Sequence, residues 1–247
     1  RSTQAKTLFP YTTLFRSTIL TSSASANSSA FSRASAIASA KQRQHPLGHV
    51  LFSGESGHGK TTLAQIIARE LGVNIKIVTG YAITKPSELI SILNNIEQGD
   101  ILFIDEIHRL KPNIEEILYI AMEDFVIDMV MPEGGNVRIP INAFTLIGAT
   151  TKMESIAGPL KNRFVYKFHF QDYSQEHKLQ IIKRYLKLYT IEATHSVVEK
   201  IEEKVESTPR EIHNFIVKIR DYLISHTKHD GQIFHFLEEL WSEFDKW

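Results

Sequence analysis

The chain has 247 residues, 43% of them hydrophobic and 23% charged, which is enough to bury one large domain or two small ones. Its 28 Lys and Arg balance 28 Asp and Glu, so the net charge argues against a surface coated with basic charge for nucleic acid. The absence of cysteine excludes disulfides and thiolate metal sites, and no apolar run approaches the roughly 20 residues that span a bilayer. We therefore expect a protein of the cytoplasm with no membrane contact.

The first residues differ in composition from the rest. Residues 17–40 are mostly Ser and Ala, and no acidic residue precedes Glu55. This composition is compatible with a targeting peptide. The run TLFPYTTLFRS at residues 7–17 has neither a helical nor a strand period, however, and looks like vector sequence. We expect residues 1–30 to be a disordered or artefactual segment.

A large domain is predicted for residues 31–172, where strand and helix patterns alternate. Apolar runs predict strands at residues 49–54, 74–80, 101–106, 144–151 and 165–170. Helical patterns follow the first strand and occupy residues 86–100 and 112–124, each opened by a proline. Such alternation predicts an α/β fold with a parallel sheet flanked by helices.

Two further segments are predicted from pattern alone. Residues 125–141 form two β-rich arms around Gly134-Gly135, which indicates a hairpin. Beyond Ser174 only helical spacing remains, so residues 173–228 are predicted to form a small all-helical lid domain. The tail at residues 229–247 is aromatic and amphipathic.

A phosphate-binding loop is the strongest motif. Residues 54–61 read GESGHGKT, which fits GxxxxGK[ST] between a predicted strand and helix. Glycines let backbone amides turn inward around phosphate oxygens, Lys60 adds charge near the β- and γ-phosphates, and Thr61 offers a hydroxyl to Mg²⁺. The alternative is a chance glycine-rich loop. The predicted nucleotide-binding residues are Gly54, Gly57, His58, Gly59, Lys60, Thr61 and Thr62.

A pair of acids ends the third predicted strand. In ILFIDEIH, Asp105 and Glu106 follow an apolar run, and the carboxyl ends of parallel strands face the ligand crevice. We expect Asp105, together with Thr61, to hold Mg²⁺, and Glu106 to orient or deprotonate the attacking water. The alternative is an ordinary acidic strand end.

Three further positions match polar sites of AAA+ ATPases. Thr151 follows the fourth strand, where a residue can sense the γ-phosphate, although it could simply cap the strand. Arg163 can act as an arginine finger on a neighbouring subunit, or it can form a surface salt bridge. Arg210, at the start of a lid helix, can reach the phosphates of its own subunit or have no ligand. The eleven histidines lack the spacing of a metal cage.

Residues 37–222 closely resemble the RuvB family of bacterial Holliday-junction branch-migration ATPases. The resemblance is most specific in GVNIKIVTGYAITKPSELISILNNIEQGDILFIDEIHRL, EEILYIAMEDFVIDMV, FTLIGATTKMESIAGPLKNRF and STPREIHNFIVKIRDY. It implies an AAA+ P-loop core, a homo-hexameric ring, ATP and Mg²⁺ as cofactors, and four-way junction DNA as substrate. It also implies a junction-binding partner that docks on the hairpin at residues 127–141.

The chain departs from the family pattern in several places. Its loop reads GESGHGK where the family usually has two prolines and an apolar residue, and Lys161 stands where the family usually has Arg. The family's winged-helix domain would start near Gln232, so we expect a truncated or divergent member. Two other functions stay open: a clamp-loader-like AAA+ switch without sustained translocation, and a remnant that only binds nucleotide.

Overall fold

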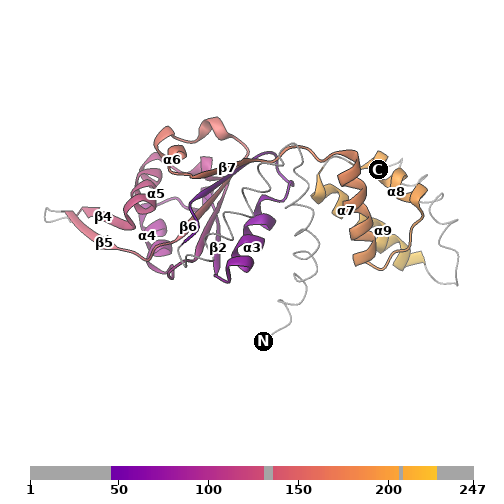
Figure 1. The fold of residues 1–247 in the computed structure, drawn as a ribbon, viewed down its shortest axis with the longest axis horizontal. Coiled ribbons are helices and arrows are strands. Elements are labelled where there is room, and N and C mark those ends of the chain that lie inside the picture. The colour runs from indigo at the N-terminus through magenta and orange to yellow at the C-terminus, as the bar shows by residue number, and fades with distance from the viewer. Residues whose placement is uncertain (1–45, 131–135, 206–207, 227–247) are drawn as a thin grey trace. The chain divides into compact units, whose positions relative to one another are not determined.

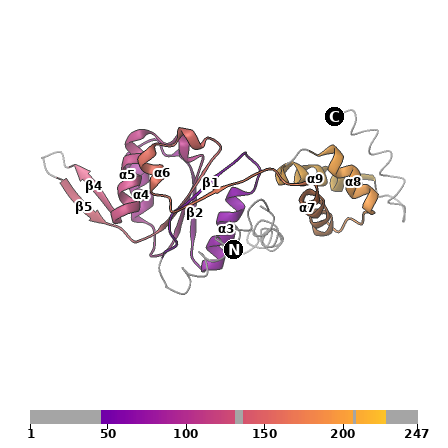
Figure 2. The same cartoon turned by 45° about the horizontal axis from the view of Figure 1, so that its top comes forward.

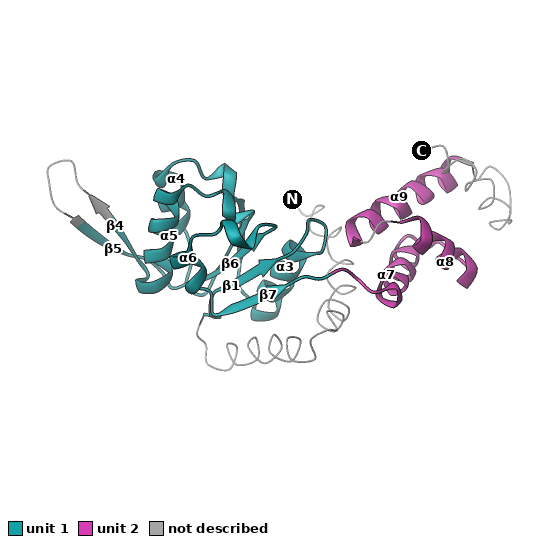
Figure 3. Cartoon of the chain, turned by 90° about the horizontal axis from the view of Figure 1, so that it is seen from above, with its two compact units in different colours: residues 1–171 teal, residues 172–247 magenta. Residues whose placement is uncertain are grey.

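The computed structural model describes residues 46–130, 136–205 and 208–226. The chain divides into two compact units: unit 1 comprises residues 1–171 and unit 2 comprises residues 172–247 (Figure 3). The segments predicted for residues 1–30 and 229–247 lie outside the described residues.

Unit 1 is built on a five-stranded parallel sheet with the order β2-β3-β6-β1-β7. This confirms the predicted α/β fold class. The strands are β1 (Val50–Ser53), β2 (Ile75–Thr79), β3 (Ile101–Asp105), β6 (Thr145–Thr150) and β7 (Tyr166–His169). The central strands β1 and β6 are buried along their whole length, as expected of strands covered on both faces.

Helices cover both faces of this sheet. Helix α3 (Lys60–Leu71) lies on one face, and α4 (Pro86–Asn94) and α5 (Pro112–Asp124) lie on the other (Figures 1 and 2). Helix α4 ends six residues earlier than predicted, because the Asn95 amide folds back onto the carbonyls of the last turn.

Short elements complete unit 1, and the sequence patterns had not predicted four of them. These are α6 (Gly158–Asn162) and the 3-10 helices η1 (Gly80–Ala82), η2 (Ile107–Arg109) and η3 (Met153–Ser155). They are too short to show an apolar period.

The predicted hairpin forms. Strands β4 (Val126–Val130) and β5 (Asn136–Pro140) pair antiparallel, and Arg138 bonds Asp128 across the ladder at 2.9 Å. The predicted turn at Gly134-Gly135 lies outside the described residues.

Unit 2 consists, in its described part, of three helices that pack through apolar faces. They are α7 (Gln175–Leu188), α8 (His195–Lys204) and α9 (Pro209–His226). A polar contact also joins α7 to α8: Glu202, only 9% exposed, lies 3.3 Å from the ammonium of Lys178 and 3.2 Å from the amide of Gln175. The predicted all-helical character of this region is therefore observed.

Candidate active site at the carboxyl edge of the sheet

The loop after β1 lies between the carboxyl ends of strands β6 and β7. The Gly54 amide donates a 3.2 Å hydrogen bond to the carbonyl of Thr150 at the end of β6. On the other side, a Cβ on Gly54 would lie 2.6 Å from the carbonyl oxygen of Phe170, after β7. Gly54, Gly57 and Gly59 all have positive φ, at 136°, 87° and 91°, which side chains disfavour. The loop therefore needs these glycines for its path.

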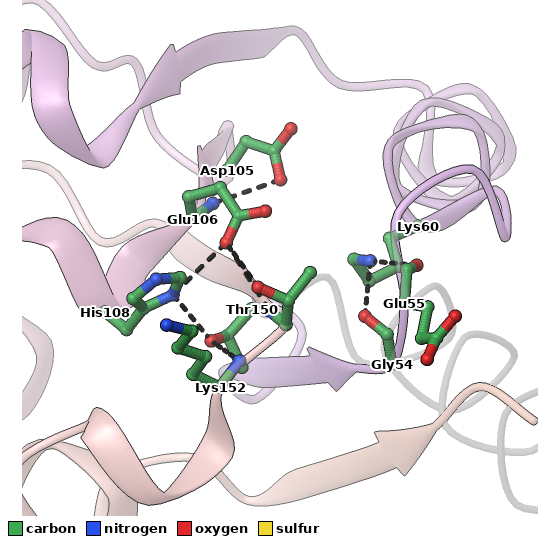
Figure 4. Close-up of polar contacts among 9 residues, drawn as sticks. Gly54, Glu55, Lys60, Asp105, Glu106, His108, Thr150 and Lys152 are labelled. Atoms are coloured by element: carbon green, nitrogen blue, oxygen red, sulfur yellow. Dashed lines mark hydrogen bonds and ion pairs between the residues drawn. The ribbon is translucent and has the colours of Figure 1, made fainter.

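Lys60 begins helix α3 and points back into the loop. Its side chain is almost fully buried, and its ammonium donates to the carbonyls of Gly54 and Glu55 at 2.8 and 2.7 Å (Figure 4). The helix has no acidic residue in its first turn, so the positive end of its dipole is not neutralised. The loop thus concentrates positive potential where a phosphate would bind.

Other predicted loop residues are partly or fully buried. Thr61 and Thr62, in the first turn of α3, are half-buried. His58 is only 1% exposed as a whole residue.

Asp105 and Glu106 end β3 on the same edge of the sheet. Asp105 accepts a 3.1 Å hydrogen bond from the Glu106 amide. Glu106 has φ 49° and ψ 48°, the left-handed conformation that a glutamate rarely adopts. The Arg109 amide donates a 2.8 Å hydrogen bond to the Glu106 carbonyl. The same carbonyl oxygen lies so close to Gly80 that a Cβ added there would be only 2.4 Å away. Backbone strain of this kind gathers at functional sites.

The carboxylate of Glu106 meets the end of β6. Its Oε2 accepts from the Thr151 hydroxyl at 3.1 Å and lies 3.2 Å from Nδ1 of His108 (Figure 4). The same Nδ1 lies 2.9 Å from the hydroxyl of Thr150, which also accepts from the Lys152 amide at 2.9 Å. Burial lowers the pKa of His108, and the Glu106 carboxylate opposes that shift. The structure thus brings Glu106 and Thr151 together.

His108 and Thr150 had no role in the sequence analysis. His108 lies inside the ILFIDEIH run, but its partner Thr150 is 42 positions away. No local pattern signals such a pair.

Arg163 follows helix α6 and is bound within its own chain. Its guanidinium donates to the Tyr119 hydroxyl at 2.9 Å, forms an ion pair with Glu123, and lies 4.6 Å from the centre of the Tyr119 ring. The hydrogen bond to Tyr119, with the charge of Glu123, raises the pKa of Arg163. The residue is therefore held against helix α5.

Arg210 belongs to unit 2, in the first turn of helix α9. The helix begins with a capping box, in which the Glu211 carboxylate accepts from the Thr208 amide at 3.3 Å and the Thr208 hydroxyl accepts from the Glu211 amide at 3.3 Å. Arg210 itself is exposed.

The loop after β1 and the buried Lys60 could hold the phosphates of a nucleotide. Thr61 and Asp105 carry the hard oxygen atoms that Mg²⁺ prefers. Among the described residues, no group of three or more His, Cys, Asp or Glu could hold a metal ion by itself. None of the described helices is both long and apolar enough to cross a membrane.

Comparisons with known proteins identify relatives of this chain. Residues 24–170 match the sequence model of the family described as Holliday junction DNA helicase RuvB P-loop domain. A Ligilactobacillus salivarius protein named Holliday junction branch migration complex subunit RuvB is 44% identical over 200 residues, which are 80% of this chain and 59% of that protein. An Ehrlichia ruminantium protein of the same name is 43% identical over 206 residues, which are 82% of this chain and 62% of that protein.

Solved structures agree. The Thermotoga maritima RuvB Holliday junction branch migration motor superposes with a TM-score of 0.70 at 38% identity, and the match covers 78% of this chain and 60% of that chain. A point mutant of Thermotoga maritima RuvB superposes with a TM-score of 0.72 at 40% identity, and the match covers 78% of this chain and 61% of the mutant chain. The chain thus spans about 60% of the length of the relatives that it matches. Since the family model covers more than half of the residues, the chain belongs to the RuvB P-loop family.

Proposed function

We propose that this chain is the ATPase module of a ring motor that drives branch migration of Holliday junctions. The observation that carries the proposal is the junction of three segments at one edge of the sheet. The loop amide of Gly54 bonds Thr150, and the neighbouring Thr151 bonds Glu106 beside Asp105. Phosphate-binding, metal-binding and water-orienting groups are thereby within reach of one another.

The predicted residues have separate roles in the hydrolysis of ATP. The loop amides and Lys60 would hold the β- and γ-phosphates, and Thr61 and Asp105 would hold Mg²⁺, which would supply charge neutralisation at the phosphate oxygens. Glu106 orients the attacking water. Thr151, which bonds Glu106 at 3.1 Å, reports the γ-phosphate to that carboxylate.

Arg163 is proposed to act on a neighbouring subunit. A guanidinium spread over the transferred phosphoryl stabilises its developing charge. To do so, Arg163 would exchange its ion pair with Glu123 for the phosphate. A mixture of Lys60→Ala and Arg163→Ala subunits tests this proposal. We expect partial rescue of ATPase activity, whereas no rescue at any ratio would exclude a shared site.

The assembly and its partners are proposed by analogy with the relatives. A homo-hexamer would give every site a neighbouring Arg163, and Arg210 would sense the bound nucleotide. The relatives' names as branch migration complex subunits support four-way junction DNA as the substrate. A junction-binding protein would dock on the hairpin at residues 127–141, and the cytoplasm is the expected compartment.

Phosphate release measured with and without four-way junction DNA tests the function. A motor should hydrolyse ATP faster with the junction and should also resolve a labelled junction into duplexes. Junction-stimulated hydrolysis without any strand separation would favour a clamp-loader-like switch. Nucleotide binding without turnover would contradict both.

A further inference from the structure

The two oxygens of the Glu106 carboxylate have different surroundings. Every polar contact that the described residues make with this group uses Oε2, which is bonded by the Thr151 hydroxyl and faces Nδ1 of His108. Oε1 receives no such contact from the described part of the chain (Figure 4). The side chain as a whole is 28% exposed. The carboxylate thus meets the described part of the protein through one of its two oxygens.

The contacts of His108 define its tautomer. A carboxylate has no proton to donate, so a contact of 3.2 Å between Oε2 and Nδ1 is favourable only when Nδ1 carries the hydrogen. The opposite tautomer would point the Nδ1 lone pair at the anion. The Thr150 hydroxyl, at 2.9 Å, can share the same hydrogen as a second acceptor. The side chain of His108 is 5% exposed, so water cannot easily replace these contacts.

Thr150 contacts the imidazole at the same Nδ1 that faces Glu106. Its residue is fully buried, and its hydroxyl is itself held by the Lys152 amide at 2.9 Å. Its carbonyl accepts the first amide of the phosphate-binding loop, that of Gly54, at 3.2 Å. Thr150 therefore contacts the loop through its carbonyl and His108 through its hydroxyl, and His108 in turn lies 3.2 Å from Glu106.

We propose that His108, held by Thr150, is a positioning residue that anchors Oε2 of Glu106 and so presents Oε1 to the attacking water. The inference rests on the proposed ATPase function and assigns a role within that site. Thr151 holds Oε2 through its hydroxyl at 3.1 Å and its amide at 3.5 Å, and His108 in η2 adds a contact with the same oxygen from a second element. The competing interpretation is that His108 only fills space beneath η2.

Three substitutions separate these interpretations. His108→Ala removes the donor and should lower kcat for ATP about 10- to 100-fold, the range expected for one hydrogen bond to a charged group. KM and the affinity for a fluorescent ATP analogue should stay within about twofold, because the loop is untouched. In His108→Asn the amide nitrogen can occupy the place of Nδ1, so most of the activity should return. His108→Gln extends its amide toward the place of Nε2 and should not restore it.

A matched control lies in unit 2. His195 makes the same kind of contact with Glu199, at 3.3 Å, but far along the chain from the site, so His195→Ala should leave kcat unchanged. Thermal unfolding of each variant shows whether it folds. Parent-like kcat in His108→Ala, or equal recovery by the Asn and Gln variants, would overturn the proposal.

A second measurement keeps the inference separate from the ATPase proposal. Long-range ¹⁵N–¹H NMR of the histidine rings reports which nitrogen of His108 is protonated. We expect the proton on Nδ1 in the parent at pH 8. A proton on Nε2 alone would contradict the anchor even if the chain hydrolyses ATP. Conversely, a parent with the Nδ1 proton but no ATPase activity would refute the proposed function and leave the anchor standing.

Discussion

His49 offers the sharpest test of the packing that supports the site. It precedes β1, and its Nδ1 accepts the Leu146 amide of β6 at 2.9 Å while its Nε2 lies 3.0 Å from the carbonyl of Met122 in α5. The ring also packs on Phe144, at 5.8 Å between centroids. Only the neutral imidazole with hydrogen on Nε2 serves both contacts. Protonation would set a second hydrogen against the Leu146 amide.

This geometry gives a pH dependence with a definite sign. Burial lowers the pKa of His49 in the folded protein, against a smaller raising effect of the Met122 carbonyl. The unfolded chain therefore takes up the proton first as pH falls. The contribution of His49 to stability is complete above about pH 6.5 and is lost below it, at up to about 1.4 kcal/mol per pH unit, until the folded pKa is reached.

The variant His49→Leu provides the reference because it cannot titrate. At pH 8 it leaves the Leu146 amide and the Met122 carbonyl unpaired, which should cost about 2 to 5 kcal/mol. Below pH 6.5 the difference between parent and variant should shrink. Hydrogen exchange of unit 1 peptides, corrected for intrinsic rates, measures both stabilities without requiring the two units to unfold together. A difference that stays constant from pH 8 to pH 5 would refute the lowered pKa of His49 in the folded protein.

Three other predictions concern Gly54, the pair of Glu202 and Lys178, and Asp105. Gly54→Ala should destabilise unit 1 by about 2 kcal/mol or more and weaken ATP binding, while Gly158→Ala, with no atom within 4 Å of the added Cβ, should change thermal stability by less than about 0.5 kcal/mol. Glu202→Ala should cost unit 2 about 2 kcal/mol, and the double variant with Lys178→Ala should lose less than the sum of the singles in urea unfolding. Asp105→Asn should lower ATPase activity at limiting Mg²⁺ and regain part of it at high Mg²⁺; an unchanged Mg²⁺ dependence would remove Asp105 from the metal site.

The sequence predicted the sheet well because its strands carry strong local signals. The run ILFID is continuously apolar and forms β3, and the GxxxxGK[ST] motif fixes the turn into α3 by its glycines. The order of the strands in space required the structure, because β1 pairs with β6 and β7, which lie far along the chain.

Long-range contacts of the site could not be predicted. The bond from Thr151 to Glu106 joins residues 45 positions apart, and the left-handed backbone of Glu106 has no sequence signature. Arg163 was expected as a finger or as a surface ion pair, but its partners on α5 were not foreseeable from the PLKNRF run. His58, which we predict to bind nucleotide, is buried, and its sequence position did not indicate that burial.

Binding and turnover measured side by side test the central claim most directly. We would titrate a fluorescent ATP analogue and follow phosphate release for the parent, Lys60→Ala and Glu106→Gln. The account predicts that Lys60→Ala binds at least about 100-fold more weakly. Glu106→Gln should bind like the parent and release no phosphate. Parent-like binding by Lys60→Ala, or parent-like phosphate release by Glu106→Gln, would contradict the assignment of this edge of the sheet as an ATPase site.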